Sequence, residues 1–303
     1  MTNVTPANIS RSKPRMRVGF VGLGNQGAPI AQRIVDGGFD SVVWARRAEA
    51  VAPFRGGPAR IARTLTELGE GLDLLDTCVF DAAGTWEVLF GADGAARAMP
   101  RGAVIAVHST VAPREVREIA EEAARYGLRV LDAPVSGGHA VAARGELVTM
   151  VGGDAQTFAE CEPVFRRFSA HLIHLGAVGA GQQAKLLNNA MLAAHLGIAA
   201  DVFALGRSLG LDPGALATVL RKGSGRSFGV EMLVSLGGLE NVATSQARPT
   251  LGKDVELLAE LLAAGDAPRT GNRGAGATLL STARGMIESL EALAAADLSA
   301  ATG

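Results

Sequence analysis

The feature that most constrains this chain is a glycine-rich turn at residues 22–27. The turn follows a short apolar run, Met16–Gly22, that predicts a buried strand, and it opens Asn25–Gly37, whose apolar residues have helical spacing. Its members are Gly22, Leu23, Gly24, Asn25, Gln26 and Gly27. In a strand–GxGxxG–helix unit, the first glycine permits the tight turn, the second lets the main chain approach a pyrophosphate, and the third allows close helix–strand packing. The pattern therefore predicts a dinucleotide-binding unit.

The residues after the second predicted strand, Ser41–Ala45, indicate which dinucleotide is bound. An acid at this point would bind the ribose 2′-hydroxyl of NAD, whereas this chain has Arg46 and Arg47 there. Two guanidiniums suit a 2′-phosphate, because they bind it through charge-assisted hydrogen bonds. We therefore expect NADP to be preferred, with NAD possible. The alternative is that both arginines are solvated loop charges.

The pattern of elements changes near residue 177. Before this residue, apolar runs that predict strands alternate with helical patterns. Further strands are expected at Leu72–Phe80, Ala103–Val107, Arg129–Ala133 and Leu147–Val151. A further helix is expected at Arg114–Tyr126. After it, helices are expected at Gln182–Leu209, Pro213–Leu220, Val230–Leu236, Asp254–Ala264 and Ala275–Ala295. We expect a Rossmann-type α/β domain at 16–177, then an all-α C-terminal domain at 178–303, joined by the long helix. Residues 1–15 are expected to form a disordered extension, and residues 271–276 a loop.

Charge and composition argue against several partners. Lys and Arg number 29 against 30 Asp and Glu, so the chain offers no excess of positive charge for nucleic acid. Apolar runs fall short of the roughly 18 residues that a membrane span needs, and the polar N-terminus lacks the apolar core of a signal peptide. Cys78 and Cys161 suit buried thiols in a reducing compartment. We expect a cytoplasmic protein without a nucleic-acid or membrane partner and, since the histidines lack ligand spacing, without a metal.

Residues 132–138, with the sequence DAPVSGG, directly follow a predicted strand. Successive main-chain N–H groups at Ser136, Gly137 and Gly138 could hold a carboxylate, with the Ser136 hydroxyl as a further donor. A plain glycine turn would give the same pattern, and this segment alone leaves the two interpretations equal.

Two residues of the long helical pattern, Lys185 and Asn189, are four apart and share one helix face. A partly desolvated lysine can act as a general acid/base, and an amide one turn later can orient it or a substrate oxygen. By spacing alone, an exposed lysine on a helix is the better interpretation. Lys253 and Asp254 open another predicted helix, where an acid is expected for helix stability alone.

Five segments taken together decide between the structural and the functional interpretations of these residues. They are GFVGLGNQG, HSTVAP (His108–Pro113), DAPVSGGHAVAARGELVTMVGG (Asp132–Gly153), GAVGAGQQAKLLNN and GKD (Gly252–Asp254). In this order they resemble the β-hydroxyacid dehydrogenase family, which includes 3-hydroxyisobutyrate dehydrogenases and tartronate semialdehyde reductases. The resemblance covers Met16 to about Ala264. It implies a Rossmann-type domain, a helical domain and catalysis in the cleft between them.

The resemblance also implies roles for particular residues. It assigns the general acid/base to Lys185, substrate positioning to Asn189, and the substrate carboxylate to Ser136, Gly137 and Gly138. It therefore implies a small, carboxylate-bearing substrate, a β-hydroxy acid that is interconverted with its semialdehyde or keto form.

Further implications concern the cofactor and the assembly. Lys253 would close over the cofactor or substrate, and Ser109 or Thr110 would lie near the nicotinamide. The family builds dimers or tetramers through the helical domain, so a homodimer or homotetramer is expected.

Three departures from the family pattern bear on the identity of the substrate. Gln26 stands where the family usually has Met, His108 replaces a more usual apolar or acidic residue, and residues 245–249 lack an aromatic that often precedes Lys253. The alternatives are an NADPH-dependent imine reductase, which usually lacks the lysine, and a non-catalytic NADP-binding protein. Lys185 argues against both.

Overall fold

The computed structural model describes residues 16–264 and 276–302. The expected extension at 1–15 and all but the last residue of the expected loop at 271–276 lie outside the described residues. The chain divides into two compact units. Of the described residues, the first unit comprises 16–109 and 117–178, and the second comprises 110–116, 179–264 and 276–302.

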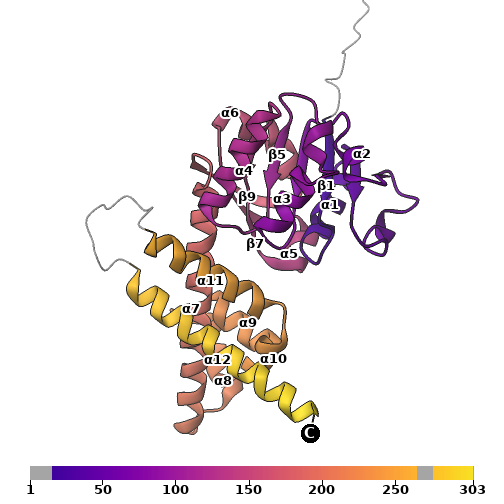
Figure 1. Cartoon of the computed structure of the whole chain (residues 1–303). Helices are drawn as coiled ribbons and strands as arrows, with labels where there is room; N and C mark the ends of the chain where they lie inside the picture. The colour runs from indigo at the N-terminus through magenta and orange to yellow at the C-terminus, as the bar shows by residue number, and fades with distance from the viewer. Residues whose placement is uncertain (1–15, 265–275, 303) are drawn as a thin grey trace, which may run out of the picture. The chain divides into compact units, whose positions relative to one another are not determined.

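The first unit is built on a sheet with nine strands among the described residues (Figure 1). These are β1 (Arg17–Val21), β2 (Asp40–Trp44), β3 (Arg60–Ile61), β4 (Leu74–Thr77), β5 (Val104–Val107), β6 (Arg129–Asp132), β7 (Val135–Ser136), β8 (Leu147–Gly152) and β9 (Ser169–Gly176). The order is β3-β2-β1-β4-β5-β6-β8-β7, with β9 beside β8. β1 to β6 are parallel, and β8 runs antiparallel to β6 and β7. The chain reverses its winding between β1 and β4, where ligands bind in open α/β sheets.

Helices pack around this sheet (Figure 1). They are α1 (Gly27–Asp36), α2 (Leu65–Gly69), α3 (Ala82–Phe90), α4 (Pro113–Arg125), α5 (Gly138–Arg144) and α6 (Ala155–Phe165). Short 3₁₀ helices lie at Ala52–Phe54 and Ala95–Ala98. α1 buries Ile30, Ala31, Ile34 and Val35, the residues whose helical spacing predicts it. The Rossmann-type fold expected from the sequence is confirmed.

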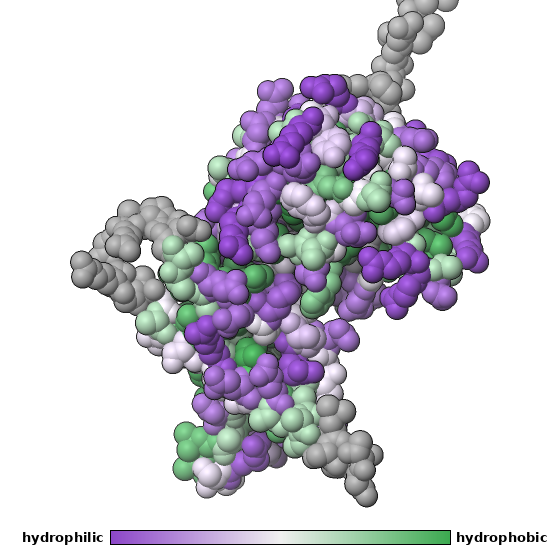
Figure 2. Space-filling model, in the orientation of Figure 1, coloured by the Kyte–Doolittle hydropathy of each residue, from purple (hydrophilic) through white to green (hydrophobic). Residues whose placement is uncertain are grey.

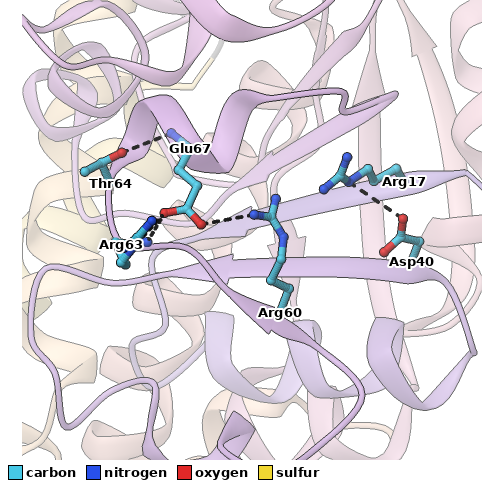
Figure 3. Close-up of polar contacts among 6 residues, drawn as sticks. All are labelled: Arg17, Asp40, Arg60, Arg63, Thr64 and Glu67. Atoms are coloured by element: carbon cyan, nitrogen blue, oxygen red, sulfur yellow. Dashed lines mark hydrogen bonds and ion pairs between the residues drawn. The ribbon is translucent and has the colours of Figure 1, made fainter.

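A group of ion pairs lies where the first three strands begin (Figure 3). Arg17, Asp40 and Arg60 open β1, β2 and β3. Arg17 pairs with Asp40 at 3.7 Å, and Glu67 accepts from Arg60 at 3.1 Å and from Arg63 at 3.3 Å. These side chains are partly or largely exposed, so the pairs contribute little to stability. Arg17 and Asp40 mark the amino ends of β1 and β2, whereas Arg63 and Glu67 follow β3.

The second unit is helical. Its helices are α7 (Ala180–Ser208), α8 (Pro213–Lys222), α9 (Phe228–Leu236), α10 (Leu239–Thr244), α11 (Ala247–Ala263) and α12 (Ala277–Thr302). The long α7 packs against α9, α11 and α12 (Figure 1). Its contact face is rich in alanine, including Ala190 and Ala193, because small side chains let helix axes approach closely. The predicted long helix and helical domain are confirmed.

The start of α11 differs from the prediction. The predicted helix begins at Asp254, whereas the observed helix begins at Ala247. Pro249 is tolerated because the first turn of a helix has unpaired N–H groups in any case, and the Ser245 hydroxyl accepts from Ala247 N at 3.2 Å. Asp254 therefore lies inside the helix, where its side chain is fully buried.

By length and composition, α7 is long and apolar enough to cross a membrane, with a mean hydropathy of 1.4 over its most apolar stretch. Such a helix is weak evidence, because the core helix of a soluble protein passes the same test. Here α7 supplies Leu186 and Leu196 to the core of the second unit. The absence of a membrane partner stays a prediction.

Candidate functional site

A pocket of about 440 Å³ lies at the carboxyl ends of β1 and β2 in the first unit. This volume falls within the range of small-molecule sites. The lining residues come from the glycine turn, the end of β2 and the segment after β4. They are Val21, Gly22, Leu23, Gly24, Trp44, Ala45, Arg46, Arg47, Ala50, Val79, Phe80, Asp81, Gly84 and Val88. The glycine turn and both arginines that the sequence selected thus line one pocket.

The three glycines of the turn meet different needs. A Cβ on Gly27 would lie 2.0 Å from the Gly22 carbonyl oxygen, and one on Gly22 would lie 2.3 Å from the Cys78 carbonyl oxygen. Gly22 also has a φ of 96°, which disfavours any side chain. A Cβ on Gly24 would meet no protein atom within 4 Å. Packing therefore requires Gly22 and Gly27, whereas Gly24 leaves open space for a bound group.

Gln26 is a second sign that this turn receives a ligand. Its amide nitrogen is buried and has no hydrogen-bond partner among the described residues. A buried donor left unpaired costs about 1–3 kcal/mol. A phosphate or amide oxygen of a dinucleotide would satisfy it. The residues of this pocket fit such a cofactor.

The Ser136–Gly138 turn is tied to the glycine turn. Ser136 ends β7, and Gly137 and Gly138 have φ values of 141° and 78°, a conformation that glycine adopts without strain. The next residue, His139, donates from Nδ1 to the Asn25 carbonyl oxygen at 2.7 Å. This bond brings the predicted carboxylate-binding turn beside the predicted pyrophosphate-binding turn. Nothing in the sequence pattern singled out His139.

Ser109, which is expected near the nicotinamide, also makes hydrogen bonds within the first unit. It is buried, and its hydroxyl accepts from Val79 N at 3.1 Å and from Thr85 Oγ1 at 3.3 Å. Ser109 thereby joins the end of β5 to the pocket wall after β4. Its expected position near the nicotinamide stays a prediction.

The second unit holds a compact group of polar residues between α7 and α11. Asn189 donates from its side chain to Asp254 at 2.5 Å, and Lys253 Nζ donates to the other Asp254 oxygen at 2.9 Å. Lys253 Nζ also donates to the Thr110 carbonyl oxygen at 2.5 Å. Lys185, Asn189 and Asp254 are 8%, 4% and 0% exposed. Lys185 is therefore not the exposed helix lysine that its spacing alone favoured.

Burial lowers the pKa of Lys185 to about 8. The negative charge of Asp254 opposes this shift, and the positive charge of Lys253 adds to it. An amine with a pKa near neutrality exchanges protons readily in both directions at physiological pH, as a general acid/base requires. Perturbed pKa values of this kind gather at functional sites.

Two polar residues in or beside this group, Asp254 and Gln182, were not predicted as site residues from the sequence. Asp254 was interpreted only as an acid near a helix start, although GKD was among the segments that carry the resemblance. Gln182 is fully buried one turn before Lys185, and its side-chain oxygen accepts from Val111 N at 3.1 Å. A polar residue at a buried helix position was the signal available for both. Among the residues that the structure describes, no group of three His, Cys, Asp or Glu could hold a metal ion.

Comparison with known proteins assigns both units. Residues 17–176 match the family model for the NAD-binding domain of 6-phosphogluconate dehydrogenase. Residues 179–300 match the model described as NAD-binding of NADP-dependent 3-hydroxyisobutyrate dehydrogenase. Together these models cover nearly all of the described residues.

Individual relatives agree with this assignment. The chain is 40% identical to an uncharacterised oxidoreductase of Mycobacterium tuberculosis, over 68% of this chain and 69% of that protein. It is 36% identical to the L-threonate dehydrogenase of Cupriavidus necator, over 70% and 71% of the two chains. The solved structure of M. tuberculosis 3-hydroxyisobutyrate dehydrogenase with L-serine superposes with a TM-score of 0.76 at 28% identity, over 92% and 94%. With its NAD(P)-binding fold, its glycine-turn pocket and these relatives, the chain belongs to the β-hydroxyacid dehydrogenase family of NAD(P)-dependent enzymes that act on CH–OH groups.

Proposed function

We propose that this enzyme interconverts a small β-hydroxy acid and its semialdehyde or keto form, with NADP as the preferred cofactor and Lys185 as general acid/base. The observation that carries the proposal is the buried lysine of α7 with a pKa of about 8, in a chain whose family oxidises CH–OH groups.

The pocket of the glycine turn, with Arg46 and Arg47, would hold the nicotinamide cofactor, which would supply the hydride-transfer chemistry when bound. In the oxidative direction, neutral Lys185 removes the proton of the substrate hydroxyl at Nζ; in reduction, its ammonium form protonates the new alkoxide. Asn189 orients the reacting oxygen or the lysine, and its own amide is held by Asp254 at 2.5 Å. The N–H groups of Ser136, Gly137 and Gly138 hold the substrate carboxylate. Lys253 contacts cofactor or substrate.

The names of the relatives guide the choice of test substrates. L-threonate, 3-hydroxyisobutyrate and L-serine are each a small acid with a hydroxyl on the β-carbon. The experiment is to measure NADP⁺ reduction by absorbance with these acids and further 3-hydroxy acids. Turnover of at least one supports the proposal, and the best substrate defines the side group that the site accepts.

Other outcomes of this experiment favour the alternatives. Reduction of a cyclic imine by NADPH, without turnover of any hydroxy acid, would indicate an imine reductase. Tight NADPH binding without turnover of either class would indicate a non-catalytic protein.

The Asp254→Asn variant is expected to shift the activity profile to lower pH. The carboxylate of Asp254 raises the pKa of Lys185 against the effect of burial, so a neutral amide removes that support and the pKa falls below about 8. The isosteric amide side chain keeps an oxygen for Asn189. The measurement is the pH dependence of kcat for oxidation beside Glu256→Gln, an exposed acid of the same helix. An unchanged midpoint in Asp254→Asn would contradict the electrostatic role.

We also propose that two copies associate through the second unit. Figure 2 shows hydrophobic side chains on the surface of this unit, including the region where α7 ends and α8 begins. Exposed apolar residues on α7 follow helical spacing at Leu187, Met191, Ile198 and Leu205, and the exposed Leu209 directly follows the helix. Exposed apolar patches of this kind mark association surfaces. A second copy that buries this face is consistent with the dimer or tetramer that the family resemblance implies.

The Ile198→Glu/Leu205→Glu variant is expected to sediment as a monomer, because it places two charges in the proposed interface. Both residues are more than half exposed, so the folded monomer tolerates them. Ser289→Glu, at an exposed position of α12, is the control and should keep the assembly of the unmodified protein. A wild-type chain that is monomeric at micromolar concentration would refute the proposal.

A further inference from the structure

A buried Asp–His pair joins the ends of three adjacent strands in the first unit. Asp76 belongs to β4, His108 directly follows β5, and Ala133 directly follows β6. His108 Nε2 lies 2.8 Å from Asp76 Oδ1, and its Nδ1 lies 2.7 Å from the Ala133 carbonyl oxygen. The imidazole therefore extends from the central strand to both of its neighbours.

The geometry determines how the pair holds its protons. The Ala133 carbonyl oxygen can only accept, so Nδ1 carries a proton. The 2.8 Å separation of Nε2 and Asp76 Oδ1 is that of a second hydrogen bond, with one proton between the two atoms. Both bonds of the imidazole are directional, so they fix its orientation.

The surroundings of the pair are apolar. Asp76 and His108 are 0% and 3% exposed. The imidazole stacks on Phe20 with ring centres 6.4 Å apart and contacts the edges or faces of Phe165 and Phe168 at 5.8 and 5.5 Å. Asp76 Oδ2 has no hydrogen-bond partner within the described part of the chain. An apolar pair of similar volume would often be as stable or more so, so stability alone does not account for these residues.

The strands that the pair joins, β4, β5 and β6, each lead into a segment of the candidate functional site. β4 leads into Val79–Asp81, which lines the dinucleotide pocket. His108 is followed by Ser109, whose hydroxyl accepts from Val79 N. Ala133 precedes the short β7 that ends at Ser136. The pair thus connects the strand ends that lead to the cofactor pocket, to Ser109 and to the turn predicted to bind the substrate carboxylate.

We propose that Asp76 and His108 are positioning residues that fix the spacing of these three segments. The inference rests on the proposed function, because it assigns the pair a role in aligning substrate carboxylate and cofactor for hydride transfer. Misplacement of reacting groups by about 1 Å can lower a rate by about 10²-fold. The pair itself contacts neither substrate nor cofactor.

The test separates alignment from folding. Asp76→Val/His108→Leu removes both partners together and leaves no unpaired buried charge; only the Ala133 carbonyl oxygen loses its donor, so the Tm should fall modestly and the protein should still fold. We expect kcat/KM to fall about tenfold or more, and NADPH affinity, followed by fluorescence, to fall as well. Asp76→Asn is the matched control, because its amide can donate to Nε2 while Nδ1 still donates to Ala133. It should keep both values.

Wild-type kcat, KM and NADPH affinity in the double variant would overturn the inference. If that variant does not fold, Asp76→Ala replaces it, since His108 Nδ1 keeps its bond to the Ala133 carbonyl oxygen and only β4 is released. Unchanged NADPH affinity and kcat in Asp76→Ala would likewise refute the role. NADPH affinity needs no substrate, so it decides the inference even if no hydroxy acid is turned over by the wild type and the proposed function fails.

Discussion

Replacement of Lys185 by alanine is expected to lower kcat for the best β-hydroxy acid by about 10²–10⁴-fold, the usual contribution of a positioned general acid/base. Lys185 is 8% exposed, so a water molecule has little access to take over the position of its amine. NADPH affinity should change little, because the glycine turn and its pocket belong to the first unit. The measurement is steady-state kinetics with fluorescence titration of NADPH on the same preparation.

Lys222→Ala is the control for this variant. Lys222 lies in the last turn of α8 and is exposed, so its loss should leave kcat within about twofold. A Lys185→Ala variant that retains more than a tenth of the wild-type kcat would show that another group moves the proton.

The pH dependence of the wild type gives the same test without a mutation. Oxidation requires the neutral amine, so kcat for oxidation should rise with pH and level off above a midpoint near the pKa of about 8. Reduction requires the ammonium form and should fall through the same midpoint. Two profiles with the same sign would contradict the assignment of one group to both directions.

Removal of both pocket arginines, Arg46→Ala/Arg47→Ala, is expected to reduce the preference for NADP over NAD by about 10–100-fold per arginine. A hydrogen bond to a charged group contributes about 1.5–3 kcal/mol, and each 1.4 kcal/mol is a factor of ten. Both residues are exposed on the pocket wall, where a 2′-phosphate would meet them. The preference is measured as the ratio of kcat/KM for the two cofactors.

The control is Arg63→Ala. The Arg63 side chain is 90% exposed, pairs with Glu67 and is not among the residues that line the pocket, so the cofactor ratio should not change. If the pocket variant keeps the wild-type ratio, the arginines are solvated loop charges, and another feature selects the cofactor.

Sequence periodicity and glycine spacing determined much of this protein. A strand, a GxGxxG turn and a helix within a few residues of one another are governed by local backbone geometry, so the order of residues alone predicts them. Lys185 and Asn189 share a helix face because four residues are about one helical turn. The boundary of α11 was wrong because Asp254 was interpreted as the acid of a helix start, whereas the helix begins at Ala247, and Pro249 in its first turn breaks no hydrogen bond.

The tertiary structure decided the chemistry of these residues. Asn189 and Asp254 are 65 residues apart in the chain and meet only where α7 and α11 pack. The pKa of Lys185 depends on how completely that packing excludes water. The pair of Asp76 and His108 forms because β4, β5 and β6 are neighbours in the sheet. Periodicity gives the face on which a side chain lies, but its partners and its desolvation arise from contacts between distant segments.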